Sequence, residues 1–264
     1  SADGATLLAT RSRHGRTDLV TVEVASGSVT VLAQGGTWSS PHWLPDGGVV
    51  AIHESFTQPS RLCVVADGAV RELYAGVPAP VRVAPHVEPE HVSYTSFDGM
   101  TVHGWLYRPR TAAAGRRCPA VVHPHGGPTS VAGDEWDGVV QYFVDKGYAW
   151  FQPNFRGSTT YGRDHERADH GVWGVADTHD CLAAYDHLAS LDWIDPSRIA
   201  IFGASYGSYM ALHSVVDDGE HRFACAVSKY GDCDILTSWA QGDLVGRLDL
   251  ERMMGHPRGA REAY

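Results

Sequence analysis

The feature that most restricts the fold is a serine held between two glycines. Residues 203–207 read Gly-Ala-Ser-Tyr-Gly, directly after the apolar run 199–202 and directly before the helical run 208–216. A serine in a tight strand-to-helix turn has a strained backbone, so the flanking positions favour residues without side chains. Its hydroxyl projects from the turn beside the N–H of Tyr206. The string alone is a weak signal, but this setting predicts that Ser205 is a catalytic nucleophile.

Strands alternate with helices from residue 91 onward. A hairpin around Asp98-Gly99 comes first, and then strands and helices are expected at 120–123, 139–146, 148–152, 178–191, 199–202, 208–216 and 223–228. This order implies a mostly parallel sheet with helices on both faces. A hairpin that enters such a sheet is typical of α/β-hydrolase domains. We therefore predict the N-terminal part of an α/β-hydrolase fold for residues 91–264.

The first 75 residues repeat themselves. Asp3-Gly4 and Asp46-Gly47 each precede an apolar strand, and strand, turn and short strand follow in both copies. The period of about 43 residues is typical of a four-stranded propeller blade. Residues 1–75 are therefore predicted to form about two blades of a β-propeller, with a plain meander of hairpins as the alternative. Residues 76–90 contain four prolines and are predicted to be a linker.

A second motif fits the predicted nucleophile. Residues 123–128 read His-Pro-His-Gly-Gly-Pro and follow a buried type of strand. Acyl transfer develops negative charge on a carbonyl oxygen, which two preorganised backbone N–H groups must stabilise. One group belongs to Tyr206, and a glycine-rich loop after an earlier strand supplies the other. We predict Gly127 for that donor, with Gly126 as the near alternative and a simple glycine turn as the structural one.

Composition excludes several functions. The formal charge of −10 argues against nucleic acid or an anionic membrane as partner, and no apolar run is long enough to span a bilayer. The five cysteines are scattered, which favours a reducing compartment, and we predict a cytoplasmic protein. His123 and His125 have no third ligand at a suitable spacing. We therefore expect no metal and no cofactor.

Three motifs together resemble the prolyl oligopeptidase family. They are residues 125–128, residues 154–159 (Asn-Phe-Arg-Gly-Ser-Thr) and the extended serine motif 203–210, in that order. Within the family they most resemble the acylaminoacyl-peptidase and dipeptidyl-aminopeptidase-like branch. The preceding propeller, linker and hairpin also fit, so the resemblance covers essentially the whole chain.

The resemblance implies a serine peptidase that acts on short peptides. Ser205 would be the nucleophile, and the N–H groups of Tyr206 and Gly127 would form the oxyanion hole. It leaves open a homo-oligomer for the full-length protein. Ser208 and Thr160 stand where the family usually has glycine. Neither position carries a reacting atom, so we expect altered loop packing there and unchanged chemistry.

A serine nucleophile needs a histidine base and an acid that orients the base. In α/β-hydrolases these follow the serine on later strands, and after Ser205 this chain has one clear strand. Asp232 or Asp234 with His256 is the local alternative, although His256 lies in a stretch that resembles a surface helix. We expect the triad Asp and His beyond Tyr264. The chain would then be a fragment that lacks the last hydrolase strands and most propeller blades, and would be inactive alone.

Three residues are predicted to bind substrate. Trp239, together with Leu236, would line an apolar pocket, and Arg156 would hold a substrate carbonyl or carboxylate. Core packing and a structural salt bridge are the respective alternatives. A carboxylesterase or amidase would use the same serine motif. A non-catalytic module that binds through its propeller-like strands is the alternative from another functional class.

Overall fold

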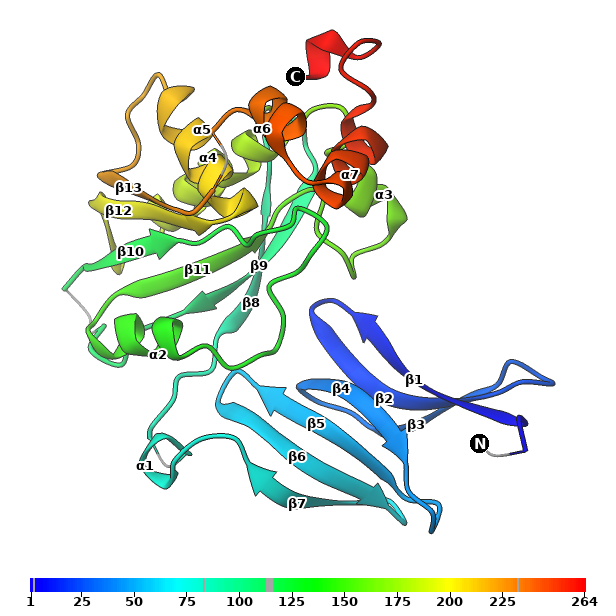
Figure 1. Ribbon diagram of the computed structural model, residues 1–264. Helices are drawn as coiled ribbons and strands as arrows, with labels where there is room; N and C mark the ends of the chain where they lie inside the picture. The colour runs from blue at the N-terminus through cyan, green and yellow to red at the C-terminus, as the bar shows by residue number, and fades with distance from the viewer. Residues whose placement is uncertain (2, 83, 113–115, 232) are drawn as a thin grey trace. The chain divides into compact units, whose positions relative to one another are not determined.

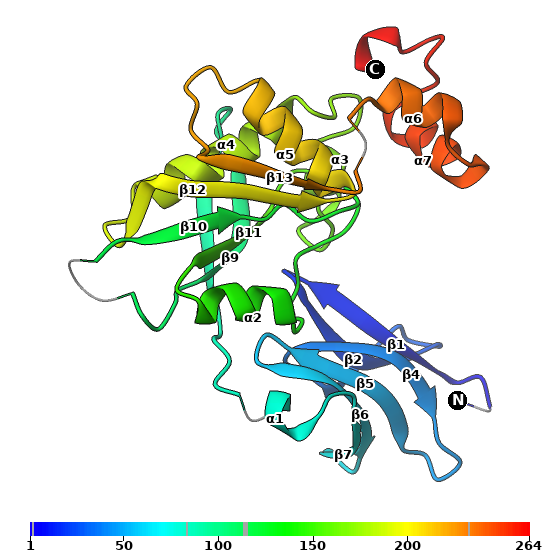
Figure 2. The same ribbon diagram turned by 60° about the vertical axis from the view of Figure 1, so that its left-hand side comes forward.

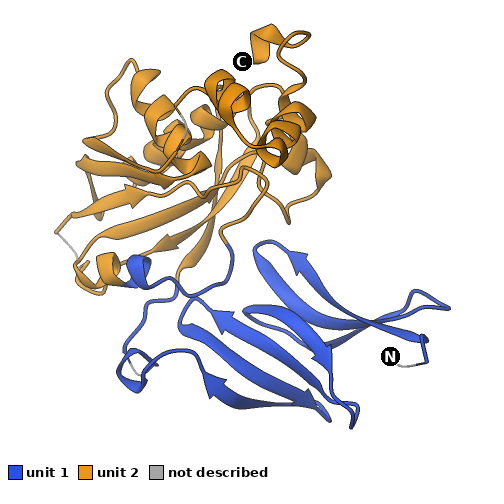
Figure 3. Ribbon diagram, viewed as in Figure 1, with its two compact units in different colours: residues 1–88, 133–141 blue, residues 89–132, 142–264 orange. Residues whose placement is uncertain are grey.

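The computed structural model describes residues 1–264 except 2, 83, 113–115 and 232 (Figure 1). The chain forms two compact units, residues 1–88 with 133–141 and residues 89–132 with 142–264 (Figure 3). The change of unit after residue 88 falls inside the predicted linker, which also contains the short helix α1 (Ala79–Arg82). The membership of residues 133–141 in unit 1 was not foreseen from the sequence.

Unit 1 is a sheet of mostly antiparallel strands. Its described strands are β1 (Thr6–Arg13), β2 (Arg16–Glu23), β3 (Val29–Ala33), β4 (Thr37–Trp43), β5 (Val49–Ser55), β6 (Gln58–Ala66) and β7 (Ala69–Ala75). They pair in the order β1-β2-β4-β5-β6-β7, and β3 pairs with β2. The predicted repeat of strands is present, while its assignment to a propeller stays a prediction.

Two matching hairpins show how the sequence sets this register. His14-Gly15 and Asp67-Gly68 both have positive φ at both positions, with φ between 51° and 74°. Two-residue loops of this kind match the twist of antiparallel strands. Leu19, Trp38 and Cys63 point inward from the strands and are at most 2% exposed, which gives unit 1 its own core.

Unit 2 contains a six-stranded mixed sheet. Its strands are β8 (Glu90–Thr95), β9 (Thr101–Tyr107), β10 (Cys118–Val122), β11 (Ala149–Asn154), β12 (Ile194–Ala204) and β13 (Cys225–Lys229). The order is β13-β12-β10-β11-β9-β8. The strands β10 to β13 run parallel, and the hairpin β8–β9 joins antiparallel to β11. The predicted α/β architecture with an entering hairpin is thus confirmed.

Helix α2 (Gly138–Asp145) begins in unit 1 and ends in unit 2. The other described α-helices of unit 2 are α3 (Arg163–Arg167), α4 (Ala176–Ala189), α5 (Tyr206–Val216), α6 (Ile235–Gln241) and α7 (Leu244–Met254), with a final 3₁₀ turn at Arg261–Ala263. Helices α4 and α5 lie side by side on one face of the sheet (Figure 2). The core of unit 2 contains Ile199 and Ile201 of β12 and Met210 of α5, and all three side chains are fully buried. None of the helices in the described part of the chain has the length and apolar character that crossing a bilayer requires.

The packing of the unit 2 core predicts how much stability is lost when a buried side chain is truncated. Ile201→Ala removes a fully buried side chain from β12, while Val227→Ala truncates a side chain of the neighbouring strand β13 that is 50% exposed. We expect Ile201→Ala to lower the free energy of unfolding of unit 2 by about 2–5 kcal/mol, because it leaves a cavity. The Val227→Ala control should change it by less than about 1 kcal/mol. Urea unfolding followed by hydrogen exchange of β12 measures both, and equal losses would contradict this account of the core.

Candidate active site

Ser205 occupies the turn between β12 and α5 in a strained conformation, with φ 55° and ψ −127°. The glycines on either side are required by close backbone contacts. A Cβ on Gly203 would lie 1.8 Å from the carbonyl oxygen of Gly207, and a Cβ on Gly207 would lie 2.2 Å from that of Pro124. Non-glycine residues rarely adopt such backbone angles, and those that do gather at functional sites. The exposed Ser205 therefore has the geometry that the sequence motif indicates.

The loop of residues 123–128 passes directly beside this turn. A Cβ on Gly126 would lie 3.3 Å from Cβ and 3.8 Å from Oγ of Ser205. Gly127 has φ 133° and lines the same cavity as Ser205 and Tyr206. The structure thus brings these three predicted residues together at one cavity. Their roles in catalysis stay predictions.

The cavity at Ser205 has a volume of about 510 Å³, which is large enough for part of a peptide. Aromatic rings of Trp173 and Tyr209 line it beside Tyr206, and Ile235 and Leu250 add aliphatic surface. Helices α6 and α7 therefore supply one wall, and the serine turn supplies the other. Asp243 and Asp249 also line the cavity, so its wall is acidic as well as apolar.

The motif at residues 154–159 supports the neighbouring loop. The Asn154 side chain accepts a hydrogen bond from the N–H of Ala132 (2.7 Å) and donates one to the carbonyl of Ala132 (3.0 Å). The N–H of Thr159 donates to the carbonyl of Ser130 (2.7 Å). Asn154 is fully buried, so these bonds fix the chain that follows Gly127. The sequence identified this segment only through its resemblance to a family motif, and its support of the neighbouring loop was not predicted.

His123 and His125 anchor the same loop. Their Nδ1 atoms lie 2.6 Å from the carbonyl oxygens of Phe202 and Gly126, and His125 Nε2 lies 2.8 Å from the hydroxyl of Ser158. Burial lowers the pKa of His125 to about 4. The ring is therefore neutral, and Nδ1–H donates to the Gly126 carbonyl. Both histidines thus hold the loop that faces Ser205.

Comparison with known proteins agrees with this geometry. The sequence pattern of the prolyl oligopeptidase family matches residues 135–264. The acylamino-acid-releasing enzyme of Sus scrofa is 29% identical over 243 residues, which is 86% of this chain. Residues 135–264 therefore resemble the prolyl oligopeptidase family in sequence. The uncharacterized peptidase YuxL of Bacillus subtilis is 35% identical over 142 residues, or 53% of this chain.

A solved structure extends the similarity to almost the whole chain. The acylaminoacyl peptidase of Pyrococcus horikoshii has a TM-score of 0.86 and 25% identity over 98% of this chain. The chain spans 42% of that protein, 33% of the Sus scrofa enzyme and 21% of YuxL. The mixed α/β sheet of unit 2 fits the α/β-hydrolase fold expected for this family.

The two departures from the family pattern have visible local effects. Thr160 has φ 72°, a left-handed conformation that favours glycine, so the strain there is borne by a β-branched residue. Ser208 is fully buried, and its hydroxyl forms a hydrogen bond with that of Ser228. A Cβ on Gly231 would lie 2.2 Å from Cβ of Ser208, so the loop after β13 packs tightly on this side chain.

Arg156 is held by two acids. Its side chain donates to Asp180 from Nε (2.9 Å) and Nη2 (2.9 Å) and to Asp98 from Nη1 (2.9 Å). The side chain is 5% exposed, and Arg156 is not among the described residues that line the Ser205 cavity. These ion pairs favour the structural salt bridge that the sequence left open. Its predicted role in substrate binding remains without support.

Trp239 and Leu236 also lie outside the described lining of this cavity, whereas Ser238 of the same helix belongs to it. The indole Nε1–H of Trp239 donates to Glu251 of α7 (2.9 Å), and its ring packs edge-on against His256. The side chain thus joins α6 to α7. Its assignment to a substrate pocket stays a prediction, and the geometry favours the packing alternative.

The local triad has no geometric support. Asp232 lies outside the described residues, and Asp234 caps α6 by accepting from the N–H groups of Leu236 and Thr237. His256 accepts from the N–H of Arg258 (3.2 Å). In the part of the chain that the structure describes, no histidine forms a hydrogen bond with the hydroxyl of Ser205.

A pair of buried acids beneath Tyr206 escaped the sequence reasoning. The Tyr206 hydroxyl donates to Asp177, which also accepts from the N–H of Thr178 (2.9 Å). Asp169 is 1% exposed, and its oxygens have no hydrogen-bond partner among the described residues. Burial raises the pKa values of Asp169 and Asp177 to about 7. The Asp177 carboxylate adds to the rise in the pKa of Asp169, and the Asp180 carboxylate adds to the rise in the pKa of Asp177.

The raised pKa of Asp169 predicts that the free energy of unfolding depends on pH. Its folded pKa of about 7 exceeds its unfolded value of 3.8, so folding loses stability as the pH rises from about 4 to about 7. The full penalty, at most about 4 kcal/mol, is present above pH 7. We expect Asp169→Asn to stabilise the chain clearly at pH 8 and little at pH 4, by urea unfolding.

The exposed Asp192 provides the control. Asp192→Asn should change the stability equally little at both pH values. A stabilisation by Asp169→Asn that is the same at pH 4 and pH 8 would show that the Asp169 carboxyl titrates normally in the folded protein.

Proposed function

We propose that this protein is a serine peptidase that hydrolyses short peptides through an acyl-enzyme on Ser205. The observation that carries the proposal is the strained turn at Ser205, with φ 55°, facing the Gly126-Gly127 backbone across a shared cavity. The match of residues 135–264 to the prolyl oligopeptidase family supports the same reaction class. A carboxylesterase or amidase would use the same serine turn, and this match favours the peptidase.

The proposed reaction starts with attack of Ser205 Oγ on the peptide carbonyl carbon. The carbonyl oxygen takes up negative charge in the tetrahedral intermediate, and the N–H groups of Tyr206 and Gly127 are proposed to stabilise it. Tyr206 is the first residue of α5, so its N–H has no partner within the helix. Loss of the amine leaves an ester on Ser205, which water then hydrolyses.

The serine hydroxyl needs a base to accept its proton. We propose that a histidine and its orienting acid come from chain beyond Tyr264. The described residues place no histidine on the Ser205 hydroxyl, and the chain spans 42% of its solved relative, which supports this arrangement. We propose that the protein is an exopeptidase of the acylaminoacyl-peptidase, dipeptidyl-peptidase or aminopeptidase kind. Its similarity to the acylamino-acid-releasing enzyme of Sus scrofa supports this specificity.

The nucleophile is tested in the full-length protein that contains this chain. Ser205→Ala should lower kcat for aminoacyl anilides by about 10³-fold or more and abolish labelling by a fluorophosphonate probe, because no other group can form the ester. Ser208→Ala, on the same helix, is the matched control and should retain both. Undiminished labelling of Ser205→Ala would exclude this nucleophile. An unlabelled wild-type protein would instead favour a non-catalytic binding module.

A panel of substrates tests both the substrate class and whether this chain by itself contains the catalytic base. The full-length protein should hydrolyse aminoacyl or peptidyl anilides at a higher kcat/KM than p-nitrophenyl esters of simple acids. The present chain alone should show negligible turnover on both, because Ser205 lacks a base. Family-like turnover by the purified chain, lost on Ser205→Ala, would show that the base lies within these residues.

A further inference from the structure

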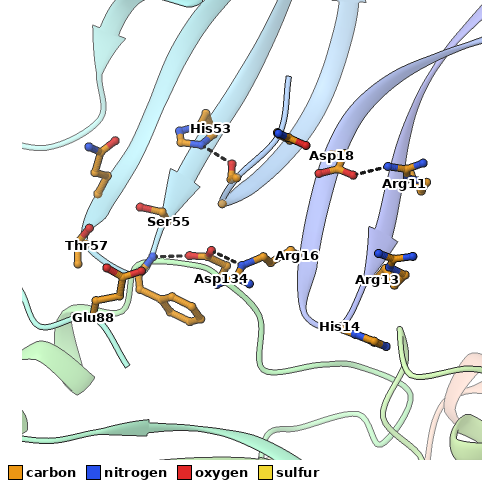
Figure 4. A pocket seen from close by; sticks show the side chains of 15 residues that line it. Arg11, Arg13, His14, Arg16, Asp18, His53, Ser55, Thr57, Glu88 and Asp134 are labelled. Atoms are coloured by element: carbon orange, nitrogen blue, oxygen red, sulfur yellow. Dashed lines mark hydrogen bonds and ion pairs between the residues drawn. The ribbon is translucent and has the colours of Figure 1, made fainter. Parts of the chain in front are cut away.

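Unit 1 contains a second cavity, separate from Ser205, with a volume of about 850 Å³ (Figure 4). All of its lining residues belong to unit 1. The β1–β2 hairpin forms one side, and the β5–β6 turn with Thr57 and Glu88 forms the other. The volume lies within the range of small-molecule and peptide sites.

Three arginines gather on the hairpin side. Arg13 lies directly opposite Arg16 in the antiparallel register, and Arg11 lies opposite Asp18. Directly opposed residues point to the same face of a sheet, so Arg11, Arg13 and Arg16 share the face that lines the cavity. Like charges opposite each other destabilise a hairpin. The Arg13–Arg16 pair is therefore unfavourable to the extent that neighbouring carboxylates or a bound anion do not offset the two charges.

Two of these arginines have a carboxylate partner. Arg11 donates to Asp18 (2.7 Å), and Arg16 donates through Nε to the buried Asp134 (3.1 Å). Asp134 also accepts from the N–H of Phe56 (2.8 Å), which fixes its carboxylate. The Arg13 side chain has no ion pair or hydrogen bond to the described residues. Its guanidinium thus presents a fork of donors at the cavity, next to Arg16, whose partner Asp134 also accepts from the N–H of Phe56.

We propose that this cavity binds the carboxylate group of a short peptide, with Arg13 as the principal ligand. A guanidinium binds a carboxylate through two parallel hydrogen bonds. The carboxylates of Asp18, Asp134 and Glu88 also line the cavity and would repel a phosphate dianion more strongly than a single carboxylate. The proposal does not depend on the chemistry proposed for Ser205.

The remaining lining suits a peptide chain. The side-chain amides of Gln34 and Gln58 and the hydroxyls of Ser55 and Thr57 also line the cavity. Such groups can donate to and accept from peptide N–H and C=O groups. Glu88 lies across the cavity from the hairpin (Figure 4).

Calorimetric titration of the whole chain tests the site without using catalysis. The probe is trialanine with a free C-terminal carboxylate, compared with its C-terminal amide, in a low-salt buffer free of phosphate. We expect the acid to bind at least tenfold more tightly than the amide, because hydrogen bonds to a charged group are lost with the amide. Arg13→Gln should remove this preference. Arg71→Gln, an exposed arginine on β7 outside the cavity, should keep it.

Equal binding of acid and amide, or unchanged binding by Arg13→Gln, would overturn the proposal. Tighter binding of inorganic phosphate than of trialanine, with the same dependence on Arg13, would also overturn it by assigning the site to phosphate. Titration of Ser205→Ala separates this cavity from the proposed active site, because that variant should bind the acid as the wild type does.

A second variant tests the repulsion between Arg13 and Arg16 directly. Arg13→Glu replaces the like-charge pair with an opposed pair, so the ligand-free chain should melt a few degrees higher at low salt while losing the acid preference. Circular dichroism checks that both Arg13 variants fold. An unchanged or lower melting temperature for Arg13→Glu would show that the arginines do not repel each other in the free protein, and would remove the basis for an anion at this face.

Discussion

The candidate site depends on backbone packed against backbone at the turn around Ser205. Gly203 and Gly207 approach so closely that a methyl group at Gly203 would overlap the Gly207 carbonyl, and one at Gly207 would overlap that of Pro124. The serine turn and the loop of residues 123–128 are thus joined without intervening side chains. This contact leaves the N–H of Tyr206 and the backbone of Gly127 beside the same cavity. A larger residue at either glycine would separate the two halves of the site.

Buried polar groups keep that loop in place. Asn154 satisfies both backbone groups of Ala132, and the neutral His125 holds the Gly126 carbonyl and contacts Ser158. A buried polar network is favourable only when its members are satisfied, so each of these bonds depends on the others. Arg156 adds to this network, because its ion pairs with Asp180 and Asp98 connect the loop that follows β11 to α4 and to the β8–β9 hairpin. The segment 154–159 is therefore structural support for the loop at Ser205.

Sequence reasoning succeeded where the signal is local. The serine between two glycines, the glycine pair at 126–127 and the hairpin at Asp98-Gly99 each encode their own backbone geometry, and the structure reproduces those shapes. Contacts between residues that are far apart in the chain could not be predicted in this way. The partners of Arg156 lie 58 and 24 positions away in the chain, and no local pattern announces such a pairing.

The same limit explains Trp239 and residues 133–141. An apolar residue on a short helix can face a pocket or a neighbouring helix, and only the arrangement of α6 against α7 decides that Trp239 reaches Glu251. Asp134 looks like an ordinary loop acid in the sequence. Its hydrogen bonds to Phe56 and Arg16 arise from segments 78 and 118 positions away, and these bonds draw the 133–141 segment into unit 1.

The buried acids beside the serine turn destabilise the fold when they are ionised. Asp177 accepts the hydroxyl of Tyr206, whose ring also packs against Trp173 at 4.8 Å between ring centres. Gly157 leaves no room for a side chain against Asp169, since a Cβ there would lie 2.4 Å from its carboxyl oxygen. A carboxyl placed so deeply without a partner is stable in its neutral form, which burial enforces by raising its pKa to about 7. Near neutral pH Tyr206, which lines the Ser205 cavity, therefore forms a hydrogen bond to a carboxyl that is close to its titration point.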